Sequence, residues 1–173
     1  MESVAALPWN RWPACYGISG SFGVEYAGTV VGAITIYMLG YLIFDLAFGE
    51  FYSANAGSAT GLVRDPQLMW APALGSISYA ALLTLAIGTR GDSVTIVDGI
   101  KTAAIVGFLL WFTVDFIYYG NFNVLNLTLA VVDPLLELVR AGIGGAVIAA
   151  VLGKISGAQE EPQTSAEEDQ QTE

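Results

Sequence analysis

Four long apolar stretches constrain this chain more than any other feature of its sequence. They cover residues 27–48, 68–88, 102–119 and 124–153. A helix needs about 20 apolar residues to cross a hydrocarbon core about 30 Å thick, and each stretch meets that requirement within the usual tolerance. A transmembrane β-barrel would instead show segments of about 10 residues that alternate in polarity. The sequence therefore predicts an all-α membrane protein with four transmembrane helices in an up-down bundle.

The composition agrees with a membrane protein and excludes several functions. Hydrophobic residues make up 54% of the 173 residues and charged residues only 13%, whereas about a quarter is usual in soluble domains. The net charge of -10 and the lack of a basic patch exclude a nucleic-acid-binding module. Cys15 is the only cysteine, and histidine is absent. A disulfide framework, histidine-assisted catalysis and imidazole metal sites are therefore excluded, and we expect no catalytic residue, metal or cofactor.

The ends of the chain differ from its centre. Residues 1–26 have Trp9, Trp12 and Tyr16 around Arg11, a composition that suits the membrane interface. This segment lacks the apolar core of a cleavable signal peptide. Residues 155–173 are polar and acidic, so we expect a disordered tail. The transmembrane domain is expected between them, over residues 27–154.

The basic residues predict an orientation. With four crossings, both termini lie on the same face as the connection between the second and third stretches. That face collects Arg11, Arg90, Lys101 and Lys154, and the opposite face has only Arg64. Basic residues accumulate on the cytoplasmic side of membrane proteins. We therefore expect a multi-pass protein of the cell membrane with both termini in the cytoplasm.

Small residues at four-residue spacing are expected to hold the helices together. Such spacing places them on one helix face, where backbones can approach closely. Each stretch has such a set: Gly28 and Gly32, Ala71 and Gly75, Ala103 and Gly107, and Ala141, Gly145 and Ala149. These surfaces predict a compact bundle surrounded by lipid. They leave open whether the chain also forms a homo-oligomer or joins a larger membrane complex.

Charged residues inside the apolar stretches are the candidate site. Charges are costly within a bilayer and persist mainly where they face the bundle interior or water. In the predicted topology, Asp45, Asp115 and Asp133 lie at a similar level near the outer surface. Glu137 and Arg140 share a helix face with Asp133, and the Arg140 guanidinium suits a carboxylate partner. We take these five residues as candidates for binding a ligand or ion.

Pro134 leaves two alternatives for the fourth helix. Asp-Pro often opens a helix, with Asp as the N-cap and Pro at the first position. The helix would then begin at Asp133. Alternatively, a longer helix passes through Pro134 and is kinked there. In either arrangement Asp133 would lie at a break that could line a cavity.

Two interpretations of these charges remain open. Arg140 and the acids could form ion pairs that only fix the packing of the bundle, or they could surround a binding cavity. Nearby polar residues suit either interpretation, namely Tyr118, Tyr119, Asn121, Asn123 and Asn126. An intramembrane aspartyl protease is excluded because "VVDP" replaces the glycine-containing motif expected around the second aspartate, and because the chain is too short.

Three segments carry a resemblance to a known family. They are "FDLAFGEFYSANAG" (44–57), "FTVDFIYYGNFN" (112–123) and "LTLAVVDPLLELVRAGIGGA" (127–146). Over about residues 27–154 the chain resembles small four-helix bacterial and archaeal membrane proteins that form a domain of unknown function. It departs from their pattern at Val114 and Pro134. The resemblance implies the four-span fold and a shared role for the three aspartates, and it implies no activity.

The leading functional hypothesis is a protein that binds or transports a small molecule or cation through an outward-facing acidic cavity. Asp115 and Asp133 would form the site, with Asp45 in support and Arg140 as counter-charge. Proton-linked binding is expected where carboxylates are buried together. The alternative is a structural or accessory subunit that packs against another membrane protein. A four-helix drug exporter fits less well, because its essential acid lies in the middle of the first span.

Overall fold

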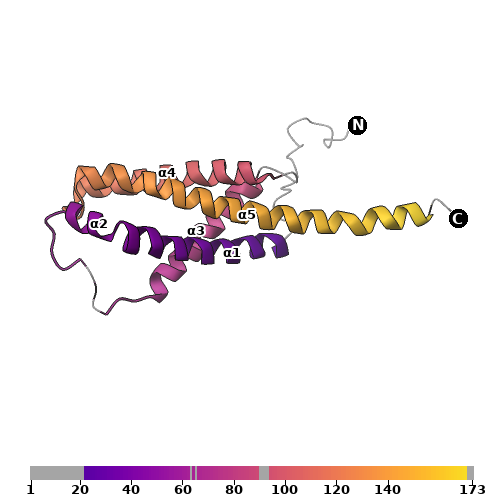
Figure 1. Ribbon diagram of the computed structural model, residues 1–173, viewed down its shortest axis with the longest axis horizontal. Coiled ribbons are helices and arrows are strands. Elements are labelled where there is room, and N and C mark those ends of the chain that lie inside the picture. Colours follow the sequence, from indigo (N-terminus) through magenta and orange to yellow (C-terminus); the bar gives the residue numbers. More distant parts are fainter. Residues whose placement is uncertain (1–21, 63, 65, 90–93, 171–173) are drawn as a thin grey trace, which may run out of the picture.

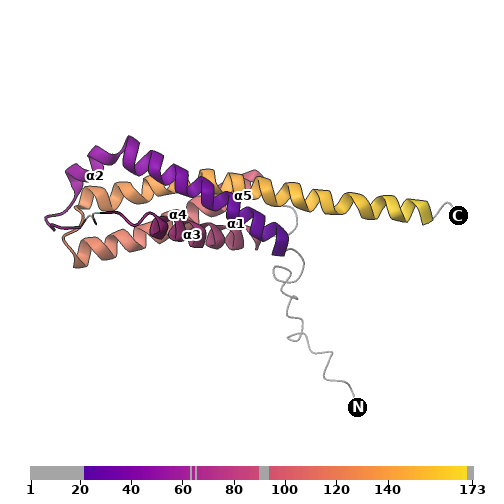
Figure 2. The same cartoon turned by 90° about the horizontal axis from the view of Figure 1, so that it is seen from below.

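The protein is all-helical over the part of the chain that the structure describes. The computed structural model describes residues 22–62, 64, 66–89 and 94–170. These residues form no strand, and Ala56 and Leu125 make an isolated β-bridge. In chain order the elements are α1 (Phe22–Gly40), the π-helix η3 (Tyr41–Ala47), α2 (Gly49–Asn55), α3 (Trp70–Gly88), α4 (Ile96–Asn121) and α5 (Leu127–Gln170). Figures 1 and 2 show α5 alongside both α4 and α1, with the C-terminal part of α5 projecting beyond the others.

Four helical segments are long and apolar enough to cross a membrane. They are Glu25–Ala47, Trp70–Gly88, Ile96–Asn121 and Leu127–Lys154. Large apolar side chains remain exposed on these segments, including Ile34 (62%), Leu74 (58%) and Ile105 (57%). Exposed apolar area of this extent suits a lipid environment. The prediction of a multi-pass protein with four apolar spans is therefore confirmed.

The first span begins earlier and ends less regularly than the sequence predicts. α1 begins at Phe22 rather than at residue 27, with Glu25 in its first turn, where a negative charge stabilises a helix. The rest of the predicted interfacial segment, residues 1–21, lies outside the described residues. After Gly40 the chain changes to a π-helix, whose end carries a hydrogen bond from the Phe48 amide to the Ile43 carbonyl at 2.9 Å.

The third span also begins earlier than predicted. α4 begins at Ile96 rather than at Thr102, because Thr95 and Asp98 form a capping box. The Asp98 amide donates to the Thr95 hydroxyl at 3.1 Å. These bonds satisfy backbone donors at the start of a helix. Sequence hydropathy missed this turn because it contains Asp98 and Lys101.

The fourth span resolves the two alternatives for Pro134. α5 begins at Leu127, and the Leu129 amide donates to the Asn126 side chain at 2.9 Å. Asn126 therefore has the N-cap role that one alternative gave to Asp133. Pro134 lies inside the helix and its side chain is fully buried. The start at Asp133 is wrong, and the longer helix is the one observed.

The helix α5 extends into the acidic tail. α5 continues through Gln170, so most of residues 155–173 are helical in the structure. A helix that is already nucleated extends at little cost, and Ala, Glu and Gln are good helix formers. The tail therefore requires no apolar core of its own to continue the helix.

Small residues bring the spans together at the core, with one exception. α5 packs against α4, α1 and α3. A Cβ added at Gly145 would lie 2.4 Å from the Gly99 carbonyl oxygen, and one at Gly107 would lie 2.5 Å from the Ala141 Cβ. The predicted pair on α3 is wrong: Gly75 has nothing within 4 Å and Ala71 is exposed. That face of α3 does not contact another described helix closely.

Candidate functional site

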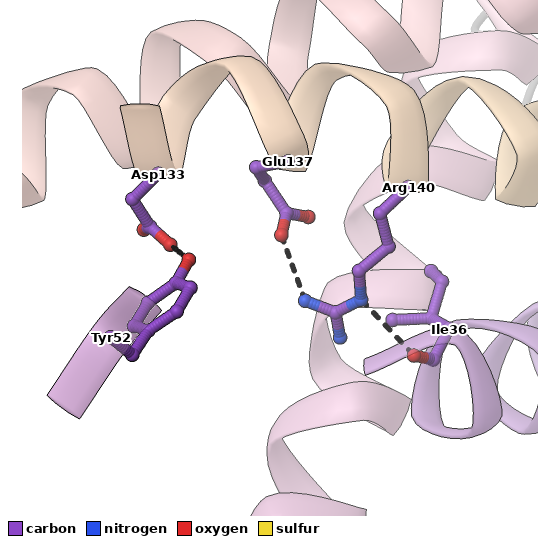
Figure 3. A network of polar contacts seen from close by, with 5 residues as sticks. All are labelled: Ile36, Tyr52, Asp133, Glu137 and Arg140. Atoms are coloured by element: carbon purple, nitrogen blue, oxygen red, sulfur yellow. Dashed lines mark hydrogen bonds and ion pairs between the residues drawn. The ribbon is translucent and has the colours of Figure 1, made fainter. Parts of the chain in front are cut away.

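The candidate site is centred on one face of α5. Asp133, Glu137 and Arg140 are 9%, 0% and 8% exposed. Figure 3 shows all three side chains projecting from α5 toward Tyr52 of α2 and Ile36 of α1. Positions four and three residues apart lie on the same helix face, so the predicted alignment of these three residues is confirmed. The face points into the bundle rather than outward.

Arg140 and Glu137 form a buried ion pair within α5. Arg140 Nη1 lies 2.8 Å from Glu137 Oε2. Arg140 Nε donates to the Ile36 carbonyl oxygen at 3.1 Å, which links α5 to the last turns of α1. The guanidinium carbon also lies 5.3 Å from the Phe44 ring centroid and 6.0 Å from that of Tyr79. Aromatic faces at these distances attract a cation, so Arg140 contacts an acid, a backbone carbonyl and two aromatic rings.

A second cluster lies nearer the start of α5. The Tyr52 hydroxyl donates to Asp133 Oδ1 (Figure 3). Asp115, on α4, is 4% exposed and lies close to Asp133. Asp115 Oδ2 is buried without a hydrogen-bond partner. Helices α2, α4 and α5 therefore each contribute one polar group to this cluster.

The two clusters adjoin each other and contain more acidic than basic side chains. Tyr52 lies within electrostatic range of all three acids, Asp115, Asp133 and Glu137. Among the described residues, Glu137 is the acid of this site that forms an ion pair, and its partner is Arg140. Asp115 and Asp133 bring two carboxyl groups close together inside the bundle, where two ionised carboxylates would repel each other.

Asp45 does not join this buried cluster. It is exposed and lies in η3. With Glu50, Tyr52 and Phe44 it lines a cavity of about 1160 Å³, which we call the acidic groove. The sequence places Asp45 at the level of the other aspartates, but η3 turns its side chain to the surface. Asp45 was predicted to lie near Asp115 and Asp133. It lies instead in the acidic groove, which Tyr52 also lines.

Sequence reasoning missed Tyr52 and Tyr79. Tyr52 follows the first apolar stretch, and no spacing in the sequence relates it to Asp133. Tyr79, on α3, lies near Glu137, and its hydroxyl group is buried without a hydrogen-bond partner. From sequence alone, a tyrosine within an apolar stretch is interpreted as a core residue or a membrane-interface residue. Only the folded arrangement of α2 and α3 brings these hydroxyl groups near the acids of α5.

The asparagines near the same end of the bundle have structural roles. The Asn126 side chain donates to Asn55 Oδ1 at 3.0 Å and caps α5. The Ala59 amide donates to the Asn123 carbonyl at 2.9 Å. These bonds fix α2 against the turn between α4 and α5. They therefore hold Tyr52 at Asp133.

The Tyr52 hydroxyl gives a prediction for high pH. Burial, the hydrogen bond to Asp133 and the surrounding negative charges raise the pKa of Tyr52 well above 10.0. Unfolding would release this proton above about pH 10, so the unfolded state then binds fewer protons than the folded state and stability falls as pH rises. We expect the wild type to lose up to about 1.4 kcal/mol per pH unit more than Tyr52→Phe, less where solvent screens the half-buried ring. Denaturant unfolding between about pH 9 and 11 measures this; parallel curves would contradict it.

Comparisons with family models, with curated proteins and with solved structures gave no match. The resemblance to four-helix proteins therefore stays a prediction. Among the described residues, no group of three or more His, Cys, Asp or Glu side chains is arranged to hold a metal ion.

Proposed function

We propose that this protein binds a small organic cation in the acidic groove and couples that binding to a proton held by Asp115 and Asp133. The observation that carries the proposal is the position of Tyr52. Its side chain lines the acidic groove, and its hydroxyl donates to Asp133. Tyr52 is therefore the contact between the groove and the buried carboxyl groups.

The lining of the groove supports an organic cation. Asp45 and Glu50 supply negative charge, and the groove contains no basic residue. The Phe44 and Tyr52 rings pack edge to face at 5.6 Å in its wall. Aromatic rings and carboxylates together favour ammonium-type ligands, which bind through charge and through cation–π attraction.

The unpartnered oxygen of Asp115 supports the coupling to a proton. An unsatisfied buried acceptor has a cost of about 1–3 kcal/mol, and Asp115 Oδ2 is such an acceptor. A cation bound in the groove beside Tyr52 would place a positive charge near the carboxyl pair and lower its affinity for a proton. Release of the shared proton when the cation binds follows from the same charge balance.

The orientation of the helices in the membrane is part of the same proposal. We infer an up-down bundle in the cell membrane, with both termini in the cytoplasm. The bias of Arg11, Arg90, Lys101 and Lys154 to one side supports this orientation. The acidic groove and Tyr52 then face the outside, as an acidic cavity for an external cation requires.

Thermal stabilisation of the purified full-length protein tests the proposed function. Tetraphenylphosphonium should raise the melting temperature, by the equivalent of about 2.7 kcal/mol at a concentration of one hundred times its Kd. The rise should shrink as the pH falls, because protons compete with the cation. Asp115→Asn and Asp133→Asn should abolish it and still melt cooperatively. Sodium in a parallel series separates an inorganic cation from an organic one.

Glu25→Gln is the matched control, because Glu25 lies in the first turn of α1, outside the cluster. It should respond to tetraphenylphosphonium as the wild type does. If no cation shifts melting and each aspartate variant simply unfolds, the cluster has only a structural role. The chain would then be better explained as an accessory subunit that packs against another membrane protein.

A further inference from the structure

A second groove lies between the first span and the beginning of α3. It has a volume of about 720 Å³ and shares only Phe44 and Asp45 with the acidic groove. Buried Arg140 and exposed Arg64 both line it, so we call it the arginine groove. Its volume lies within the range of small-molecule sites, about 300–1000 Å³.

Arg140 directs unused hydrogen-bond donors into the arginine groove. Its Nε and Nη1 are bonded to Ile36 and Glu137, whereas Nη2 makes no hydrogen bond to a described residue (Figure 3). Gly40 lines the groove beside this nitrogen, and a Cβ at Gly40 would lie 3.2 Å from Nη2. The missing side chain therefore leaves Nη2 accessible from the groove. An unpaired guanidinium N–H group in the middle of a span favours an acceptor supplied by a ligand.

The charges around the groove favour an uncharged acceptor. Glu137 neutralises Arg140, and Asp45 lies in the same groove as Arg64. Arg140 also lies in the middle of the span Leu127–Lys154, where an added charge is most costly. An anionic group at Nη2 would leave an uncompensated negative charge at that depth. A carbonyl oxygen would accept from Nη2 and add no charge.

The walls of the groove favour an apolar body. Met38 (52% exposed), Met69 (55%) and Trp70 (65%) all line it. In a bilayer these side chains face the lipid, so the ligand would enter from the membrane. We propose that the arginine groove binds a neutral, lipid-soluble carbonyl compound of the quinone type, whose carbonyl oxygen accepts from Arg140 Nη2. Flat rings of this kind also suit the Trp70 and Tyr41 side chains in the wall.

Tryptophan fluorescence of the full-length protein in detergent tests this proposal. Decylubiquinone should quench the fluorescence saturably, and Trp70→Phe should remove most of the saturable part. Gly40→Val places a branched side chain beside Nη2 and should raise the apparent Kd at least about tenfold, as expected for loss of one hydrogen bond to a charged donor. Gly120→Val is the matched control, because Gly120 has nothing within 4 Å. It should bind as the wild type does.

Three results would overturn the proposal. They are quenching that rises without saturation in the wild type, an unchanged Kd in Gly40→Val, and equal or tighter binding of decanoate, which has a carboxylate in place of the carbonyl ring. Should Gly40→Val fail to fold, Gly40→Ala replaces it, and a Kd equal to that of the control then overturns the proposal. Tetraphenylphosphonium binding at the acidic groove is measured separately, so the two sites fail or succeed independently.

Discussion

Replacement of Arg140 by methionine should lower the free energy of unfolding by about 3–5 kcal/mol. Glu137 is 0% exposed and would lose the partner that lies 2.8 Å away. The Ile36 carbonyl would also lose its donor from α5. Methionine keeps much of the apolar stem of arginine, so the loss reports mainly the uncompensated buried acid. Reversible unfolding in micelles with a rising fraction of denaturing detergent, followed by circular dichroism, measures the change.

Two further variants separate charge from packing in this experiment. The double variant Arg140→Met with Glu137→Met should recover most of the stability, because an apolar pair in place of a buried ion pair is often neutral or stabilising. Arg64→Met removes an exposed arginine and should stay within about 0.5 kcal/mol of the wild type. If the double variant is as unstable as the single one, the ion pair is not the origin of the loss.

Alanine substitutions at two glycines should change stability in opposite directions. A Cβ at Gly145 would lie 2.4 Å from both the Ala103 Cβ and the Gly99 carbonyl oxygen. Because one of these neighbours is backbone, α4 and α5 must separate, at a cost of about 1–3 kcal/mol or more. Gly75 has nothing within 4 Å, so Gly75→Ala should be neutral or stabilise the helix by up to about 1 kcal/mol.

The same unfolding experiment compares these two variants directly. Both glycines occur in small-residue pairs at four-residue spacing, so the sequence treats them alike. Equal losses for Gly145→Ala and Gly75→Ala would show that helix contacts differ from those described. A gain at Gly145 would exclude the close approach of α4 and α5.

The sequence predicted those parts of the fold and site that depend on local periodicity. Hydropathy identifies the four spans because each must satisfy the hydrocarbon core independently. The four- and three-residue spacing from Asp133 to Arg140 fixes a common face on any helix. The contact between Asp115 and Asp133 follows from two consecutive spans that meet through small residues, and the structure brings these side chains together.

The remaining features depend on irregular or distant structure. Asp45 was misplaced because the sequence gives only its depth along the first span, and the π-helix that contains it turns its side chain to the surface. Tyr52 was missed because its position depends on the short helix α2 and on the asparagine bonds to the turn before α5. The open face at Gly75 was missed because spacing says which residues share a face but not whether a neighbour covers it.

The π-helix η3 determines how α2, which follows it, is rotated about the helix axis. A π-turn accommodates more residues than an α-turn, so the seven residues Tyr41–Ala47 advance the chain by a smaller angle than an α-helix of the same length would. Rewinding this segment to the α form would rotate α2 about the helix axis and swing Tyr52 off Asp133. Arg140 is bonded at Ile36 and contacts Phe44, on either side of the winding change. Arg140 therefore links the α-helical and π-helical parts of the first span. This link helps to keep Tyr52 at Asp133.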